Sequence, residues 1–140
     1  MAMFIVIRGI ERLGVMEFIA GLILGTSHSL SILLMLILWI SAFTSAFVDN
    51  IPFVMSMIPV IKSISSSLGF DPTPLYWALS LGGCLGGNGT LIGASANIVV
   101  AGIADKHGYH ISFKTFTKRG MVVMISTVAC SAIYLLLRYT

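Results

Sequence analysis

Charge is scarce in this sequence, and that scarcity excludes most soluble folds. Only 9% of the residues are charged, whereas 57% are hydrophobic, and the mean hydropathy is +1.02. Average soluble domains carry roughly 25% charged residues. A chain of 140 residues cannot bury this much apolar surface in one soluble core. The composition therefore predicts an all-α integral membrane protein that crosses the lipid bilayer several times.

Several other features are missing, and each absence excludes a class of protein. The two cysteines, Cys84 and Cys130, make no disulfide framework. The first residues lack the charged lead and the small-residue cleavage site of a signal peptide. The net charge of +3 forms no basic patch on a soluble domain, so we expect no nucleic-acid partner. No lysine stands directly after the final glycine of the glycine-rich stretch, which excludes a phosphate-binding loop.

The sequence also lacks the residue groups that an intramembrane enzyme needs. Asp49 has no second carboxylate close to it, and neither a serine–histidine pair nor a metal-ligand spacing is present. We therefore predict no catalytic residues, no tightly bound cofactor and no enzymatic activity.

What the sequence does have is apolar segments with polar interruptions. The longest interruption lies within Leu79–Ala104, where five glycines occur within eight residues: Gly82, Gly83, Gly86, Gly87 and Gly89. Glycine lowers helix stability by roughly 1 kcal/mol per interior position relative to alanine, so we expect the helix to open at these glycines. The prediction is an interrupted helix over residues 75–104, with half-helices at 75–85 and 92–104.

A second interruption follows the apolar segment Leu30–Val48, which is long enough to cross a bilayer. The polar stretch Asp49–Pro52 comes next, and then a shorter apolar arm, Phe53–Ile61. The pattern predicts a helix and a re-entrant hairpin over residues 30–68, with a polar tip inside the protein and a loop beginning at Ser63. The sequence leaves open whether the first arm crosses the membrane fully or stops midway.

The last apolar segment follows a basic region of the chain. Ile111–Lys118 alternates apolar and polar residues, so we expect it to lie at the membrane interface. Residues 119–138 then predict a final transmembrane helix.

Polar backbone within a membrane is costly unless it faces protein, a watery cavity or an ion. We therefore predict that the two interruptions converge on one site, made by Asp49, Asn50 and Ile51 from the first and by Asn88, Gly89, Thr90, Ser95 and Asn97 from the second. Two plainer interpretations stay open. Asp49 and Asn50 can simply cap the return arm, and the pairs Gly83–Gly87 and Gly89–Gly93 can simply allow close helix packing.

The predicted site suits ligands of either charge. Helix N-termini carry partial positive charge and favour an anion, whereas C-terminal carbonyls favour a cation such as sodium. Physical chemistry alone does not choose between an anion, a cation, or both coupled.

The residues at both interruptions resemble a known family. The segments SAFVDNIPFVMSMIPVI (residues 45–61) and LGGCLGGNGTLIGASANIVVAGIADKHGY (residues 81–109) resemble the C-terminal part of the P proteins of pigment cells. These belong to the ion transporter superfamily, with arsenite pumps, sodium/proton antiporters, citrate transporters and sodium–dicarboxylate symporters. The resemblance covers essentially the whole chain.

The resemblance implies a fold of two inverted repeats, each with a re-entrant hairpin and an interrupted helix, and a site without catalytic residues. It implies possible sodium binding at Asn50, Asn88 and Thr90, with sodium or proton coupling. In dicarboxylate carriers the hairpin tip reads Ser-Asn-Thr, whereas here it reads Val48-Asp49-Asn50-Ile51. This departure, with the P-type resemblance, favours an inorganic ion as the transported substrate. The resemblance also implies a location in the membrane of a melanosome-like or endolysosome-like organelle.

The resemblance also sets an expectation about length. Family members carry both repeats, whereas residues 1–140 match only part of the second, and Met1 begins inside an expected membrane helix. We expect a piece of a secondary active transporter that works by alternating access on a small ion or anion. Its expected partners are the first repeat of the same transporter, a full-length homologue or a second copy. The alternative is a non-transporting membrane subunit that packs with, or regulates, a full-length transporter.

Overall fold

The computed structural model describes Gly21 and residues 29–139. The expected N-terminal membrane segment that includes Met1 lies outside these residues. Within the described part the chain forms helices and no strand: α3 Leu30–Ser45, α4 Asn50–Leu68, α5 Thr73–Gly86, α6 Ser95–Lys106 and α7 Phe113–Tyr139. The expected all-helical architecture is therefore confirmed for the described residues.

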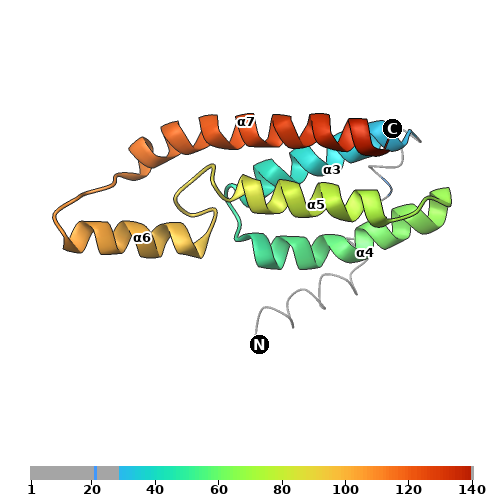
Figure 1. Cartoon of the computed structure of the whole chain (residues 1–140). Helices are drawn as coiled ribbons and strands as arrows, with labels where there is room; N and C mark the ends of the chain where they lie inside the picture. Colours follow the sequence, from blue (N-terminus) through green and yellow to red (C-terminus); the bar gives the residue numbers. More distant parts are fainter. Residues whose placement is uncertain (1–20, 22–28, 140) are drawn as a thin grey trace.

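Four of these helices form a bundle, and the fifth extends beyond it (Figure 1). α3 and α4 run in opposite directions and are joined by the turn at residues 46–49. α5 packs most extensively against α3, and α7 runs back along both of them. α6 continues past the end of α5, after a break at residues 87–94.

Two helices, α4 and α7, are long and apolar enough to cross a membrane by length and composition. α3 is a shorter apolar helix. The apolar side chains that the bundle does not bury include Ile133, Tyr134 and Leu137 on α7, and Leu137 is 84% exposed. In water this surface would be unfavourable, whereas in a bilayer it contacts lipid or neighbouring protein.

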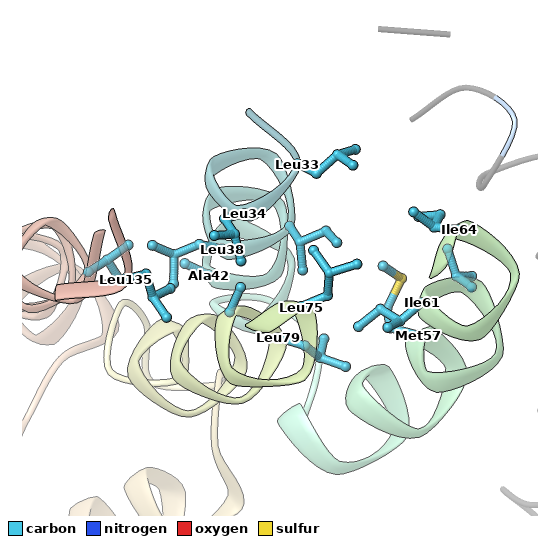
Figure 2. Close-up of a cluster of buried hydrophobic side chains, with 14 of the residues drawn as sticks. Leu33, Leu34, Leu38, Ala42, Met57, Ile61, Ile64, Leu75, Leu79 and Leu135 are labelled. Carbon is cyan, nitrogen blue, oxygen red and sulfur yellow. The ribbon is translucent and has the colours of Figure 1, made fainter. Parts of the chain in front are cut away.

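The core is a cluster of aliphatic side chains between α3, α4, α5 and α7 (Figure 2). α3 contributes one stripe, with Leu34, Leu38 and Ala42 fully buried. The other helices face this stripe with Met57, Ile61, Ile64, Leu75, Leu79 and Leu135. The spacing along α3 is that of one helical face, so the apolar period of the sequence determines which side of the helix is buried.

The return arm is longer than its apolar run predicts. We expected a short arm at Phe53–Ile61 and a loop from Ser63, but α4 continues to Leu68. Ile64 is buried on the same face as Ile61, and the Ser67 hydroxyl donates to the carbonyl of Ser63 at 2.9 Å. Packing of Ile64 against the neighbouring helices thus keeps the serine-rich stretch helical. Gly69 ends the helix in the left-handed conformation, with φ of 70°.

α5 ends at Gly86, one residue past the half-helix 75–85 that the sequence predicts, and α6 begins at Ser95 instead of residue 92. Gly82, Gly83 and Gly86 lie inside α5, and only Gly87 and Gly89 belong to the break. A methyl group added at Gly82 would lie 2.8 Å from Ser41 Cβ, and one at Gly86 would lie 2.7 Å from Ala42 Cα. These glycines are therefore tolerated in the helix because they let α3 and α5 approach closely.

This approach uses a different glycine pair from the expected Gly83–Gly87, whereas Gly89 and Gly93 both lie close to Ala46. The closest contacts with α3 involve Gly82 and Gly86, one turn apart, rather than the pair Gly83–Gly87. Gly83 instead faces α4, where an added methyl group would lie 2.8 Å from Val54 Cγ2.

The starts of α5 and α7 follow from the residues around them. Thr73 is the first helical residue of α5, and Asp71 Oδ1 accepts hydrogen bonds from its amide at 3.0 Å and its hydroxyl at 2.8 Å. The segment Ile111–Lys118 contributes its last six residues to α7, which begins at Phe113 and runs on without interruption, and its place at the membrane interface stays a prediction. Its alternating pattern is that of a helix that is exposed on several sides.

Substitution of Gly82 tests the close contact between α3 and α5. We expect Gly82→Ala to lower the free energy of unfolding by about 1–3 kcal/mol, since its methyl group overlaps Ser41 and the carbonyl of Leu38. Gly102→Ala in α6 is the matched control, because nothing lies within 4 Å of the added methyl group. Unfolding in mixed micelles measures both variants. Equal stability of the two would contradict a steric role for Gly82.

Asp71 makes the start of α5 sensitive to acid. The hydrogen bond from the Thr73 amide, and then that from its hydroxyl, holds the pKa of the Asp71 carboxyl below its usual value. A group with a lowered folded-state pKa stabilises the fold above the unfolded pKa, and loses that effect as pH falls through the folded pKa. We expect the melting temperatures of wild type and Asp71→Asn to differ at pH 6 and to converge below about pH 4. A constant difference across this range would show that ionisation of Asp71 is irrelevant.

Candidate functional site

The turn between α3 and α4 lies against the break between α5 and α6 (Figure 1). The buried hydroxyl of Thr90 donates a hydrogen bond to the carbonyl of Ala46. Gly93 lies against the same carbonyl and against that of Ser45 at the end of α3, since an added methyl group would be 2.9 Å from Ala46 O and 3.0 Å from Ser45 O. Two segments 44 residues apart thus share one patch of irregular backbone.

A second hydrogen bond joins α3 to α5 just before the break. Ser45, near the end of α3, donates its hydroxyl to the carbonyl of Gly83 at 2.6 Å, and its side chain is fully buried. The Ser45 hydroxyl is an additional donor to this helix carbonyl, and a buried hydrogen bond of this kind contributes about 0.5–1.5 kcal/mol to stability. The end of α3 is therefore attached to α5 through Ser45, and the turn is attached to the break through Ala46.

The break satisfies much of its own backbone by short-range hydrogen bonds. The amides of Asn88, Gly89 and Gly93 donate to the carbonyls three residues earlier, at 3.2, 2.9 and 3.3 Å. Asn97 completes the set from the first turn of α6: its Nδ2 donates to Gly87 O at 2.9 Å and to Thr90 O at 3.1 Å. The side-chain amide of Asn97 thus provides hydrogen-bond donors for two backbone carbonyls of the break. Opened helix backbone in apolar surroundings requires such partners.

The first group of predicted site residues lies at the start of α4. Asp49 and Asn50 are half-buried, and Ile51 is 60% exposed. Asp49 occupies the position before the first helical residue, yet its carboxylate makes no capping hydrogen bond. The simple capping interpretation therefore does not describe the Asp49 side chain. Asn50 and Ile51 line a shallow hollow of about 220 Å³ whose other lining residues are Val54, Met55 and Cys84.

The second group divides into buried and exposed residues. Gly89 and Thr90 are buried in the contact with the turn, whereas Asn88 and Ser95 are exposed. Thr90 and Asn97 have hydrogen-bonding roles within the fold, so their side chains already have partners. Asp49, Asn50, Asn88 and Ser95 make no side-chain hydrogen bond to another described residue.

The electrostatics of this region come from four helix ends. α3 and α5 end at the turn and at the break, so their last carbonyls lie there. α4 and α6 begin there, and neither Asp49 nor Ala94 supplies a side-chain capping bond. Partial negative charge from two C-termini and partial positive charge from two uncapped N-termini therefore lie close together.

Sequence reasoning missed the contribution of α7. Gly120 lies against the carbonyl of Asn88, and a methyl group added there would also be 3.1 Å from Gly89 O. A methyl group added at Gly89 would in turn be 2.7 Å from Met124 Sδ. The available signal was the glycine at the start of the final apolar segment, where a small residue allows close approach to a neighbouring backbone.

Removal of the Asn97 amide tests how the break is held. We expect Asn97→Ala to lower the free energy of unfolding by about 1–3 kcal/mol, because the carbonyls of Gly87 and Thr90 lose their side-chain donor. Ser95→Ala is the control in the same turn of α6, where the side chain is exposed. Thermal unfolding in detergent compares them. If Asn97→Ala were as stable as Ser95→Ala, the amide would not be what closes the break.

Comparison with known proteins places these features in a family context. The sequence pattern of the citrate transporter family matches residues 1–140. The chain is 40% identical to the human P protein over 146 residues, which is 99% of this chain and 17% of that protein. It is 50% identical to an uncharacterised transporter of Mycobacterium tuberculosis over 107 residues, covering 74% of this chain and 25% of the relative.

More distant relatives match over almost the full chain. An uncharacterised transporter of Synechocystis is 32% identical over 151 residues, covering 96% of this chain and 34% of the relative. The chain thus spans between 17 and 34% of the length of these three relatives. No solved structure matches it.

Proposed function

This chain belongs to the citrate transporter family, and we propose that it supplies one half of the ion site of a secondary active transporter. The observation that carries the proposal is the contact between the α3–α4 turn and the α5–α6 break, through Thr90 and Ala46. Interrupted helices that meet inside the membrane are a recurrent way for transporters to build a binding site.

In this proposal α3 and α4 form a re-entrant hairpin. The turn at residues 46–49 lies beside the break, well short of the far end of α6, in support of this (Figure 1). The hairpin then enters and leaves on one side of the membrane, and its tip lies within the protein. Pro59 lies inside α4, and the bend of this helix in Figure 1 shapes the returning arm.

We propose that Asn50 and Asn88 provide the ligand contacts, with the Asp49 carboxylate nearby. These side chains are not used by hydrogen bonds to other described residues, unlike those of Thr90 and Asn97. Amide oxygens, a carboxylate and helix C-terminal carbonyls suit a coupling sodium ion or a proton. The uncapped starts of α4 and α6 suit the anionic part of a transported substrate.

The exposed surface of α6 suggests what surrounds this helix in the full transporter. None of its residues is buried, although Ile98, Val99, Val100 and Ile103 are each more than half exposed and apolar. We propose that the other repeat of the transporter covers part of this helix and lipid the rest. In this mechanism the site opens alternately to each side as one repeat moves against the other. A homodimer and an organelle location stay predictions.

A second candidate is a non-transporting subunit of a full-length homologue. The chain spans 17% of the length of the human relative. Co-purification with a full-length homologue, without ion flux by the chain alone in liposomes, would support the subunit function. Flux by the chain alone would contradict it.

Substitution of the two amides tests the site itself. In the longest natural product that contains this sequence, we expect Asn50→Ala and Asn88→Ala each to reduce ion-coupled flux in proteoliposomes more than tenfold. Both side chains are outside the core, so membrane insertion and expression should not change. Ser66→Ala on the exposed side of α4 is the control. Normal flux in both asparagine variants would remove these residues from the site.

A further inference from the structure

Half of the basic residues of the chain lie around the start of α7. Of the eight lysines and arginines, four lie within residues 106–119, where no aspartate or glutamate occurs: Lys106, Lys114, Lys118 and Arg119. The last three belong to the first two turns of α7, and their side chains are exposed. The start of this helix therefore carries a concentrated positive charge on its surface.

These cations of α7 have no acidic partner within the part of the chain that the structure describes. The one ion pair there joins His110 to Asp105 at 2.9 Å, in the region between α6 and α7. Lys114 and Lys118 are four residues apart, and like charges at that spacing destabilise a helix. An anion bound between them would relieve this repulsion, so the cluster favours a negatively charged ligand.

Two hollows at the start of α7 share the side chains of Thr115 and Arg119. The first hollow, of about 660 Å³, is basic, and its lining residues are Lys114, Thr115, Lys118, Arg119 and Val122. The second hollow, of about 380 Å³, is lined in addition by the apolar side chains of Ile111, Phe116 and Val123. A basic hollow that adjoins an apolar one suits a ligand with an anionic head and an apolar body.

The side of α7 that carries these cations is apolar further along the helix. Val122 and Ile133 are 68% and 60% exposed, and a spacing of eleven residues puts them on one side. Lys118 precedes Val122 by about one turn on that side. The buried residues Met124 and Val128 lie on the opposite side, against the bundle. One exposed side of α7 is thus basic at its start and apolar beyond it.

The length of α7 puts its cations at the level of the lipid headgroups. Its 27 residues extend about 40 Å at 1.5 Å per residue, whereas the hydrocarbon core of a bilayer is about 30 Å thick. The apolar residues 120–137 fill most of that thickness. The two turns before Gly120 therefore lie outside the hydrocarbon, where lysine and arginine side chains meet lipid phosphates.

We propose that the first two turns of α7 bind the headgroup of an anionic phospholipid of the surrounding bilayer. Arg119 donates two parallel hydrogen bonds to phosphate oxygens, and Lys114 and Lys118 act as point charges. The acyl chains lie along the exposed apolar side that begins at Val122. A lipid held here fixes the start of α7 directly before Gly120, which packs against the break. This inference does not rest on the ion site proposed above.

The test compares melting temperatures of the purified full chain in micelles of a neutral detergent mixed with phosphatidylglycerol or with phosphatidylcholine at equal mole fraction. A ligand that binds only the folded state raises the melting temperature. We expect phosphatidylglycerol to raise it by about 3–6 °C more than phosphatidylcholine does. The double variant Lys118→Gln with Arg119→Gln should lose most of this difference. Lys62→Gln with Arg138→Gln is the matched control, because it removes two charges from exposed positions that do not line the hollow, and it should keep the difference.

Three outcomes would overturn the lipid site. If wild type melts at the same temperature with both lipids, the chain binds no anionic lipid. If both double variants lose the difference equally, the effect comes from net charge and the hollow is not the site. If glycerol 1-phosphate in plain detergent raises the melting temperature as much as phosphatidylglycerol does, the hollow binds a soluble phosphate and not a lipid. The flux assay on Asn50 and Asn88 is independent of all three outcomes.

Discussion

The structure depends on one constraint: irregular backbone in apolar surroundings must find hydrogen-bond partners inside the protein. The turn at residues 46–49 and the break at residues 87–94 meet this constraint together. Thr90 donates to Ala46, and Asn97 donates to two carbonyls of the break. Either segment alone in lipid would expose several unpaired polar groups. Their contact therefore fixes how the two halves of the described chain are arranged.

Close backbone approach makes this contact possible. Gly82 and Gly86 let α3 lie directly against α5, and Ser45 then reaches the carbonyl of Gly83. Larger side chains at these glycines would move the turn away from the break. The glycines that looked like helix breakers are thus mainly packing positions, and the opening itself is left to a shorter stretch that begins at Gly87.

The same arrangement gives the region its chemical character. Two helices end and two begin around one patch, so partial charges of both signs are available without any buried charged side chain from α5 or α6. In the proposed transporter this suits a cation and an anionic substrate together. The side chains already engaged in the fold, Thr90 and Asn97, set the geometry. Asn50 and Asn88 are left to meet the ligand.

The sequence by itself determined the membrane class, the helical content and the positions of both interruptions, because hydropathy and glycine clusters act locally along the chain. It did not determine the length of α4, since the helicity of Ser63–Leu68 depends on the burial of Ile64 against other helices. It also gave no sign that Asn97 bonds the break, or that Gly120 of α7 lies beside it. Those relations join residues distant along the chain, and only tertiary packing brings such residues together.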